Sequence, residues 1–317
     1  VATTSTAATT DPTTTPKRRR KKKKKVGRFD NALKENHPPL QFTHFLSHIP
    51  KSGTSFAFGT ISQLLWVSPE WNALNRTDRF RPCNMGTART QTHRTWMYQH
   101  RGLLCNLWMS ERGYTNQSDH IYAIVREPRE HTVSMYFHCK ESKDHQKFAY
   151  KMPSLDVWIR AWADARYNDT QAYQNARYFC YNPINYQSEF VQFDPTKGKE
   201  DLKRRYDVIG DNAQMTKSIC MIFIKYTGWV PKECDCTHGM ANVTTDSKLS
   251  YDPSTHAHGV QHHGATFKTT PEQNQLILEK IRDVDTILYE TVKEAFQEQV
   301  EELERERGIK LCDKFQD

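Results

Sequence analysis

The amino-acid sequence predicts an α/β fold with three layers, in which a mainly parallel central sheet is flanked by helices on both faces. Three short apolar runs have the length of buried strands, and they lie at 41–49, 120–125 and 206–210. A segment with helical spacing of apolar residues follows each run. Strands that alternate with helices favour parallel pairing, because each helix returns the chain to the edge of the sheet where the next strand starts.

The first strand and the first helix are joined by a short turn. Apolar residues fill 41–49, and the turn at 50–54 interrupts them with Pro50 and Gly53. Apolar residues then recur at helical spacing over 55–66. The local order is therefore strand, glycine-containing turn, helix.

The later elements follow from the same two periodicities. Pro128 stands just after the second strand and fits the first turn of a helix, where its missing N–H costs nothing. A further amphipathic helix is expected over 155–166, and the third strand leads into a helix at about 212–226. The longest periodic segment, 271–307, predicts a long C-terminal helix.

The basic character of the chain belongs to its N-terminal tail. The formal net charge is +8, and nine consecutive Lys or Arg residues occupy 17–25. Removing those nine from the 45 basic residues leaves 36 against 37 acidic residues, a net charge of −1. Residues 1–26 carry too little apolar surface to pack, so they predict a disordered Thr-rich and basic tail or stem before a folded domain at 40–310.

Three interpretations of this tail stay open. We favour a solvated linker between a membrane anchor and the folded domain. The others are a nuclear-localisation or nucleic-acid arm and a patch that attracts an acidic glycan or a membrane surface. The rest of the chain has no nucleic-acid signature, so no nucleic-acid partner is expected.

Sequons and cysteines favour the lumen of the secretory pathway. Asn75, Asn116, Asn168 and Asn242 each begin an N-x-[ST] sequon, and eight cysteines allow disulfides. The sequence has no initiator Met and no apolar run long enough to span a bilayer. We therefore expect a glycoprotein whose N-terminal membrane anchor is missing from this sequence.

Residues 48–56, with the sequence HIPKSGTSF, have the pattern of a phosphate-binding loop. A strand that ends at a glycine turn and feeds a helix presents backbone N–H groups to an anion, which the helix dipole also favours. Lys51 adds a positive charge, and Thr54 and Ser55 add hydroxyl donors. Lys51 precedes Gly53, and the nucleoside-triphosphate motif GxxxxGK[ST] is absent from the chain, which counts against a kinase or an ATPase.

This turn resembles the 5′-phosphosulfate-binding loop of the sulfotransferases that use 3′-phosphoadenylyl sulfate (PAPS), whose core is Lys-[Ser/Thr]-Gly-Thr. Residues 48–51 are especially similar to the Golgi carbohydrate sulfotransferases of the heparan and uronyl 2-O type. Those enzymes often carry two adjacent glycines, and this chain has one. The resemblance implies a P-loop-like fold and PAPS as co-substrate with no metal. It implies donor binding by Lys51, Ser52, Gly53, Thr54 and Ser55.

A second segment resembles the 3′-phosphate clamp of the same family, which is an Arg at the end of a strand and a Ser eight residues later on the next helix. Arg126 and Ser134 stand at this spacing. The physics agrees, since an Arg fork matches the geometry of a phosphate. Glu127 and His131 replace the usual Asp and Arg of the family, and both departures lie outside the two phosphate contacts.

The resemblance also implies the catalytic roles. Lys51 would contact the bridging oxygen of the donor as the S–O bond breaks. The uronyl 2-O-type relatives carry a His between the two phosphate motifs, and His100 stands 26 residues before Arg126. His100 is therefore the predicted base, with His93 and Glu111 as alternatives.

Two further likenesses are weaker. Residues 285–290 resemble the closing Asp-x-x-Leu-Tyr-Glu helix of the glycan sulfotransferases. Residues 264–271 stand where relatives place a basic loop over the donor, which makes Lys268 a predicted donor contact. The resemblance spans roughly residues 42–300.

The expected function is thus transfer of a sulfuryl group to an acceptor hydroxyl, most simply of a glycan such as an acidic polysaccharide, by a single-pass type II protein of the Golgi lumen. Two alternatives remain: a P-loop kinase of a small molecule, and a non-enzymatic polyanion-binding protein that uses the basic tail. A separate question is whether a zinc site forms at Cys234, Cys236 and the nearby histidines. We favour a disulfide or a surface loop there, and no metal site.

Overall fold

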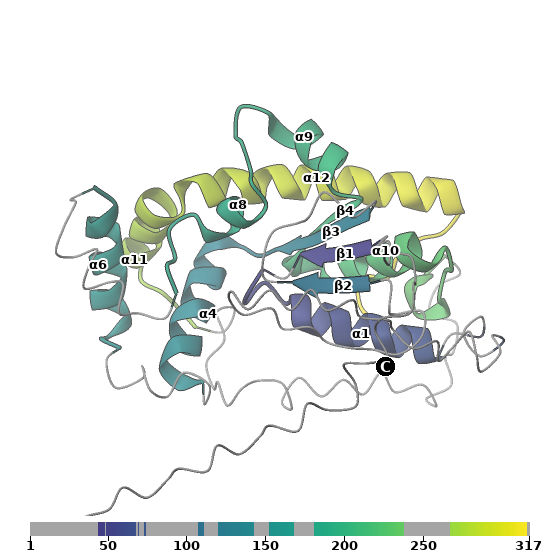
Figure 1. Cartoon of the computed structure of the whole chain (residues 1–317), viewed down its shortest axis with the longest axis horizontal. Coiled ribbons are helices and arrows are strands. Elements are labelled where there is room, and N and C mark those ends of the chain that lie inside the picture. Colours follow the sequence, from purple (N-terminus) through teal and green to yellow (C-terminus); the bar gives the residue numbers. More distant parts are fainter. Residues whose placement is uncertain are drawn as a thin grey trace, which may run out of the picture. The chain divides into compact units, whose positions relative to one another are not determined.

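The computed structural model of the protein describes residues 44–47, 49–67, 69, 73, 107–110, 120–142, 152–167, 181–237 and 267–315. All of them belong to one compact unit, Leu40–Asp317 (Figure 1). The tail predicted at 1–26 lies outside the described residues. None of the helices in the described ranges is long and apolar enough to cross a membrane.

A parallel sheet of four strands forms the centre of this unit, in the order β2-β1-β3-β4. The strands are β1 (His44–Ser47), β2 (Leu107–Ser110), β3 (His120–Val125) and β4 (Val208–Asp211). The predicted α/β class with a parallel sheet is confirmed. Strand β2 has no counterpart in the sequence prediction, because a run of four residues is too short to show an alternating pattern.

The longer helices are α1 (Thr54–Val67), α4 (Pro128–Glu141), α6 (Leu155–Tyr167), α9 (Gly198–Arg205), α10 (Met215–Thr227) and α12 (Asp283–Arg307). Shorter turns are α8 (Tyr186–Phe190), the 3-10 turns η3 (Asn212–Gln214) and η4 (Lys232–Cys234), α11 (Pro271–Gln275) and the π-helical turn η6 (Leu276–Ile281).

The C-terminal helix is not continuous, which corrects the sequence prediction for 271–307. The π turn η6 ends before Arg282, whose φ of −126° and ψ of 28° leave the helical region, and α12 starts at Asp283. Apolar spacing alone could not reveal this break. At this break the Arg282 side chain is fully buried and hydrogen-bonded to Thr132 and His131 of α4.

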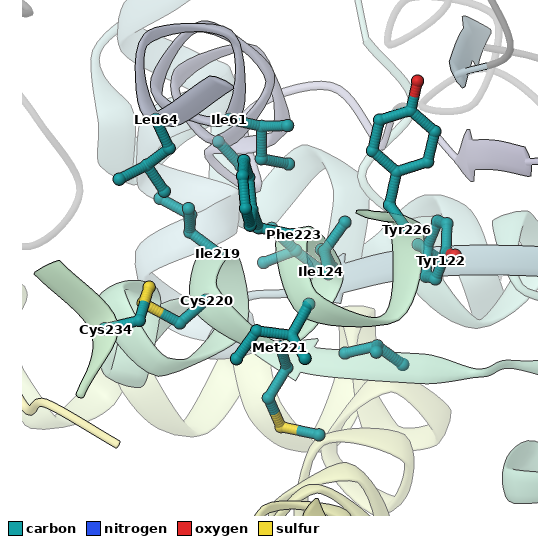
Figure 2. Close-up of a cluster of buried hydrophobic side chains, with 14 of the residues drawn as sticks. Ile61, Leu64, Tyr122, Ile124, Ile219, Cys220, Met221, Phe223, Tyr226 and Cys234 are labelled. Atoms are coloured by element: carbon teal, nitrogen blue, oxygen red, sulfur yellow. A yellow bond between two sulfur atoms is a disulfide. The ribbon is translucent and has the colours of Figure 1, made fainter. Parts of the chain in front are cut away.

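Alternation along the strands divides the core between the two faces of the sheet. Tyr122 and Ile124 of β3 pack in the cluster that includes α1, α10 and the C-terminal half of α12, whereas Ala123 and Val125 pack in the cluster that includes α9 and the N-terminal half of α12. Figure 2 shows the first cluster, where Ile61 of α1 and Phe223 of α10 lie close together. A fully buried aliphatic side chain of this kind contributes roughly 1.5–3 kcal/mol to stability.

The four described strands run in one direction, so their carboxyl ends meet at one edge of the sheet. The turn after β1, Arg126 after β3 and Asn212 after β4 are therefore neighbours. In doubly wound α/β proteins this edge is where ligands bind.

Candidate functional site

The turn after β1 has an unusual backbone. Lys51 has a φ of +69° and Gly53 a φ of +90°, both in the left-handed region. Helix α1 begins at Thr54, so the N–H groups of its first turn have no acceptor within the helix. A turn of this kind at a helix N-terminus is the arrangement that binds phosphate groups.

Three consecutive carbonyl groups of this turn are held by side chains from three other places in the fold. The ring nitrogen Nε2 of His131 lies 2.7 Å from the Pro50 oxygen. Arg126 Nη1 donates to the Lys51 oxygen at 3.2 Å, and Asn212 Nδ2 donates to the Ser52 oxygen at 2.7 Å. These contacts hold the strained Lys51 backbone in place.

The predicted hydroxyl contacts are partly engaged inside the loop. Ser52 Oγ donates to the Ile49 oxygen at 2.8 Å and lies 2.7 Å from Thr54 Oγ1. Both side chains are buried. Ser52 and Thr54 therefore shape the turn in this structure. Ser55 lies in the first turn of α1, whose backbone N–H groups have no acceptor within the helix.

Gly53 has no room for a side chain. A Cβ atom placed there would lie 2.5 Å from Met215 Cε and 2.6 Å from Asn212 Nδ2. The left-handed φ adds backbone strain for any other residue. A substitution here would displace Met215 and Asn212, and the backbone conformation favours glycine at this position.

Lys51 extends its ammonium group to helix α4. Its Nζ lies 3.1 Å from Nδ1 of His138, which is 6% exposed. Burial lowers the pKa of Lys51 from 10.5 to about 8, and the nearby positive charge of Arg126 acts in the same direction. An anion bound at this point would restore the favourable environment of the charged form.

Arg126 stands between the turn and helix α4. Its guanidinium contacts Glu130 Oε2 at 3.3 Å as well as the Lys51 carbonyl. Its backbone N–H and C=O form a reciprocal pair with the side-chain amide of Gln187, at 2.9 and 2.7 Å. The position of the guanidinium is therefore fixed from both the backbone and the side chain.

Helix α4 turns one face towards the loop. Glu127 caps the helix by accepting from the N–H groups of Arg129 and Glu130, and Pro128 occupies the first turn as predicted. His131 contacts the Pro50 carbonyl and His138 contacts Lys51, seven residues apart. Ser134 lies between them, three residues after His131, and so belongs to the same helix face.

A buried network supports this face, and Arg282 and Thr132 at its centre were not among the predicted site residues. Arg282 bonds Asp285 at 2.5 Å, Thr132 Oγ1 at 2.8 Å and His131 Nδ1 at 3.0 Å. Asp285 in turn accepts from the backbone N–H groups of Gln187 and Ser188. The network therefore joins the start of α12 to α8, to α4 and, through His131, to the loop.

The protonation state of His131 follows from its two partners. Nε2 faces a carbonyl oxygen and Nδ1 faces an Arg donor, so the proton must be on Nε2. Burial, and then the charge of Arg282, hold the pKa of His131 well below its usual range. His131 is a neutral link between the buried cation and the loop. An Arg-x-x-Asp pair at helical spacing is a signal in the sequence, but it usually indicates an exposed ion pair.

Other predicted residues lie apart from this group or outside the described residues. Lys268 is exposed, and it follows Phe267, whose carbonyl oxygen accepts from Arg129 Nη1 at 3.4 Å. This contact brings the segment to the start of α4. The predicted base His100 and its alternatives His93 and Glu111 lie outside the described residues, as does His48 of the loop motif.

The cysteines considered for zinc are in disulfides. Cys234 pairs with Cys220, and Cys236 pairs with Cys312. Their sulfur atoms are therefore not thiolate ligands, and the disulfide interpretation is correct for both. Cys139 is also disulfide-bonded, so all the cysteines in the described ranges are oxidised. No cluster of potential metal ligands occurs among the described residues.

Comparisons with protein-family models, with curated proteins and with solved structures found no match.

Proposed function

We propose that this protein is a sulfotransferase with a P-loop-like, three-layer fold, which moves the sulfuryl group of PAPS to a hydroxyl of a carbohydrate acceptor. One observation carries the proposal. The two motifs predicted to bind the two phosphate ends of the donor are 75 residues apart in the chain, yet Arg126 donates directly to the carbonyl of Lys51. Ser134 lies on the helix face that contacts the same loop.

The charges of the site suit a donor with phosphate groups at both ends. Lys51, Arg126 and the first turn of α1 offer positive charge or N–H donors around one turn. In this structure the Glu130 carboxylate forms an ion pair with the Arg126 guanidinium. A phosphate at Arg126 would take over donors that Glu130 uses, and would leave the backbone contacts of Arg126 with Gln187 unchanged.

The chemistry requires three groups. The acceptor oxygen attacks the sulfur, and the bond between sulfur and the bridging oxygen breaks. The electron pair of that bond stays on the leaving phosphate, where the Lys51 ammonium stabilises it. The proton of the acceptor hydroxyl passes to a base, for which His100 is our candidate.

The acceptor and the cellular location rest on the family resemblance and on the sequons. We propose a glycan hydroxyl in the Golgi lumen, with the basic tail as a stem that leads to a membrane anchor. The disulfides of the described cysteines suit this oxidising compartment.

The test is a transfer assay with labelled PAPS over a panel of glycans and tyrosine peptides, together with calorimetric binding of the desulfated donor product. Lys51→Ala should lower turnover about a hundredfold, because charge on the leaving group loses its partner. Arg126→Ala should weaken product binding about tenfold or more. The matched control is Arg160→Ala, since Arg160 is exposed on α6 and pairs with Asp156 and Glu272.

Two results would contradict the proposal. The first is that the wild-type protein binds neither PAPS nor the desulfated product. The second is that Arg160→Ala lowers the affinity for the product as much as Arg126→Ala does. Nucleoside triphosphates in the same binding experiment test the kinase alternative. Deleting residues 1–26 tests the polyanion alternative, because donor-dependent transfer should persist without the tail.

A further inference from the structure

Helix α4 carries a second histidine on the face that contacts the loop, and this histidine has no part in the proposed transfer step. His138 lies seven residues after His131 and four after Ser134, and its Nδ1 is 3.1 Å from Lys51 Nζ. We propose that His138 is a positioning residue, which holds the Lys51 ammonium in its catalytic direction without neutralising its charge. This inference rests on the proposed function of Lys51.

The hydrogen bond defines the state of His138. A lysine ammonium only donates, so Nδ1 must carry a lone pair and the ring proton must be on Nε2. A protonated imidazolium has no acceptor and would repel Lys51. The contact therefore requires a neutral His138 in the Nε2–H tautomer.

The backbone of Lys51 is fixed, but its side chain needs a partner. Arg126 donates to the Lys51 carbonyl. His131 and Asn212 hold the carbonyls of the residues before and after it. The side chain has four rotatable bonds, so ordering it costs rotamer entropy. His138 supplies the contact that selects one rotamer.

A neutral partner suits this position better than a carboxylate. A carboxylate within hydrogen-bond distance would hold Lys51 more strongly, but it would also compete with the phosphates of the donor. Among the described residues, Lys51 forms no ion pair with a carboxylate. An imidazole accepts one hydrogen bond and leaves the full positive charge, and two further N–H donors, for the substrate.

The two histidines of α4 thus have different hydrogen-bonding roles. His131 donates to the backbone of the loop, and its other nitrogen accepts from the buried Arg282. His138 accepts from the Lys51 side chain. Helix α4 also begins beside Arg126 and carries Ser134, so one rigid element sets the distance between Lys51 and the proposed 3′-phosphate clamp.

The experiment compares His138→Ala with His138→Asn, whose amide oxygen can accept from Lys51. Because Lys51 acts on the leaving group, His138→Ala should lower kcat roughly ten- to hundredfold, whereas the affinity for the desulfated product should change less than about twofold. His138→Asn should recover much of the lost kcat. Lys140→Ala is the matched control, because Lys140 is exposed on the same helix and its Nζ donates to the Tyr136 hydroxyl.

A spectroscopic measurement tests the contact independently of activity. A long-range ¹H–¹⁵N spectrum should show His138 as the Nε2–H tautomer, and its Nδ1 signal should move in Lys51→Met. The proposal is overturned if His138 carries its proton on Nδ1. It is also overturned if His138→Ala and His138→Asn each lower kcat and the affinity for the product by the same factor. Failure of the wild type to bind the product would instead count against the sulfotransferase function, and the spectrum would still report on the contact.

Discussion

Two irregular regions of this protein are held in place by opposite means. The loop at Pro50–Gly53 is fixed by side chains from the end of β3, from α4 and from the residue after β4, and none of these bonds is covalent. The C-terminal clip, which we define as residues 232–237 with 309–312, is fixed by two disulfides, by backbone bonds such as Cys236 N–H to the Lys310 oxygen, and by the bridge of Asp235 with Leu311.

The two regions have different requirements. The clip has no proposed binding role, so covalent bonds can hold it. Its disulfides stabilise the fold by lowering the conformational entropy of the unfolded chain. A loop that binds a phosphate must keep its N–H groups and its cation available. Its supports therefore attach to carbonyl oxygens and, at Lys51, to a neutral imidazole. We expect the loop to depend on buried charge and on pH, and the clip to depend on oxidation.

The largest effect should come from the buried ion pair behind the loop. Asp285→Ala leaves the fully buried Arg282 without its carboxylate and removes the acceptor of two backbone N–H groups of α8. The free energy of unfolding, measured by urea titration, should fall by roughly 3–5 kcal/mol.

The matched control for this variant is Glu290→Ala on the same helix. Glu290 is 61% exposed and pairs with Lys293, so its removal should change the free energy of unfolding by less than about 0.5 kcal/mol. A loss below about 1 kcal/mol in Asp285→Ala would show that the network does not support the fold.

Breaking the clip should have a smaller and separable effect. The double variant Cys220→Ala with Cys234→Ala removes a disulfide whose cysteines are 14 residues apart, and should lower the free energy of unfolding by about 3 kcal/mol. Binding of the desulfated donor product, measured by calorimetry under folded conditions, should stay unchanged. A parallel loss of product affinity would mean that the clip and the loop are coupled, against our comparison.

The smallest predicted effect is the pH response of the loop. The pKa of Lys51 is lowered to about 8, so its charge is lost as the pH rises through that value. Product affinity should fall about tenfold between about pH 7 and about pH 9, because the bound phosphate raises the Lys51 pKa and the free protein loses its proton first. Lys51→Arg should show a flat profile over this range, since a guanidinium keeps its proton. A wild-type profile as flat as that of Lys51→Arg would contradict the lowered pKa.

Local patterns in the sequence were enough to locate the central elements and the loop. The apolar run before Pro50, the glycine at position 53 and the proline at position 128 each report on the backbone within a few residues. Their predictions correspond to β1, to the turn after it and to the first turn of α4, whereas the left-handed φ of Lys51 was not predicted. Strand β2 and the break at Arg282 were not found, because four residues carry no period and a buried Arg looks like an exposed one in sequence.

The sequence by itself therefore determined the α/β class, the position of the glycine-containing turn between β1 and α1, and the candidates Lys51, Arg126 and Ser134. Only the tertiary structure decided their partners. His138 lies 87 residues from Lys51, and Asn212 lies 160 residues from Ser52. Periodicity records which face of an element is buried, whereas these contacts depend on the order of strands in the sheet, which brings the ends of β1, β3 and β4 to one edge.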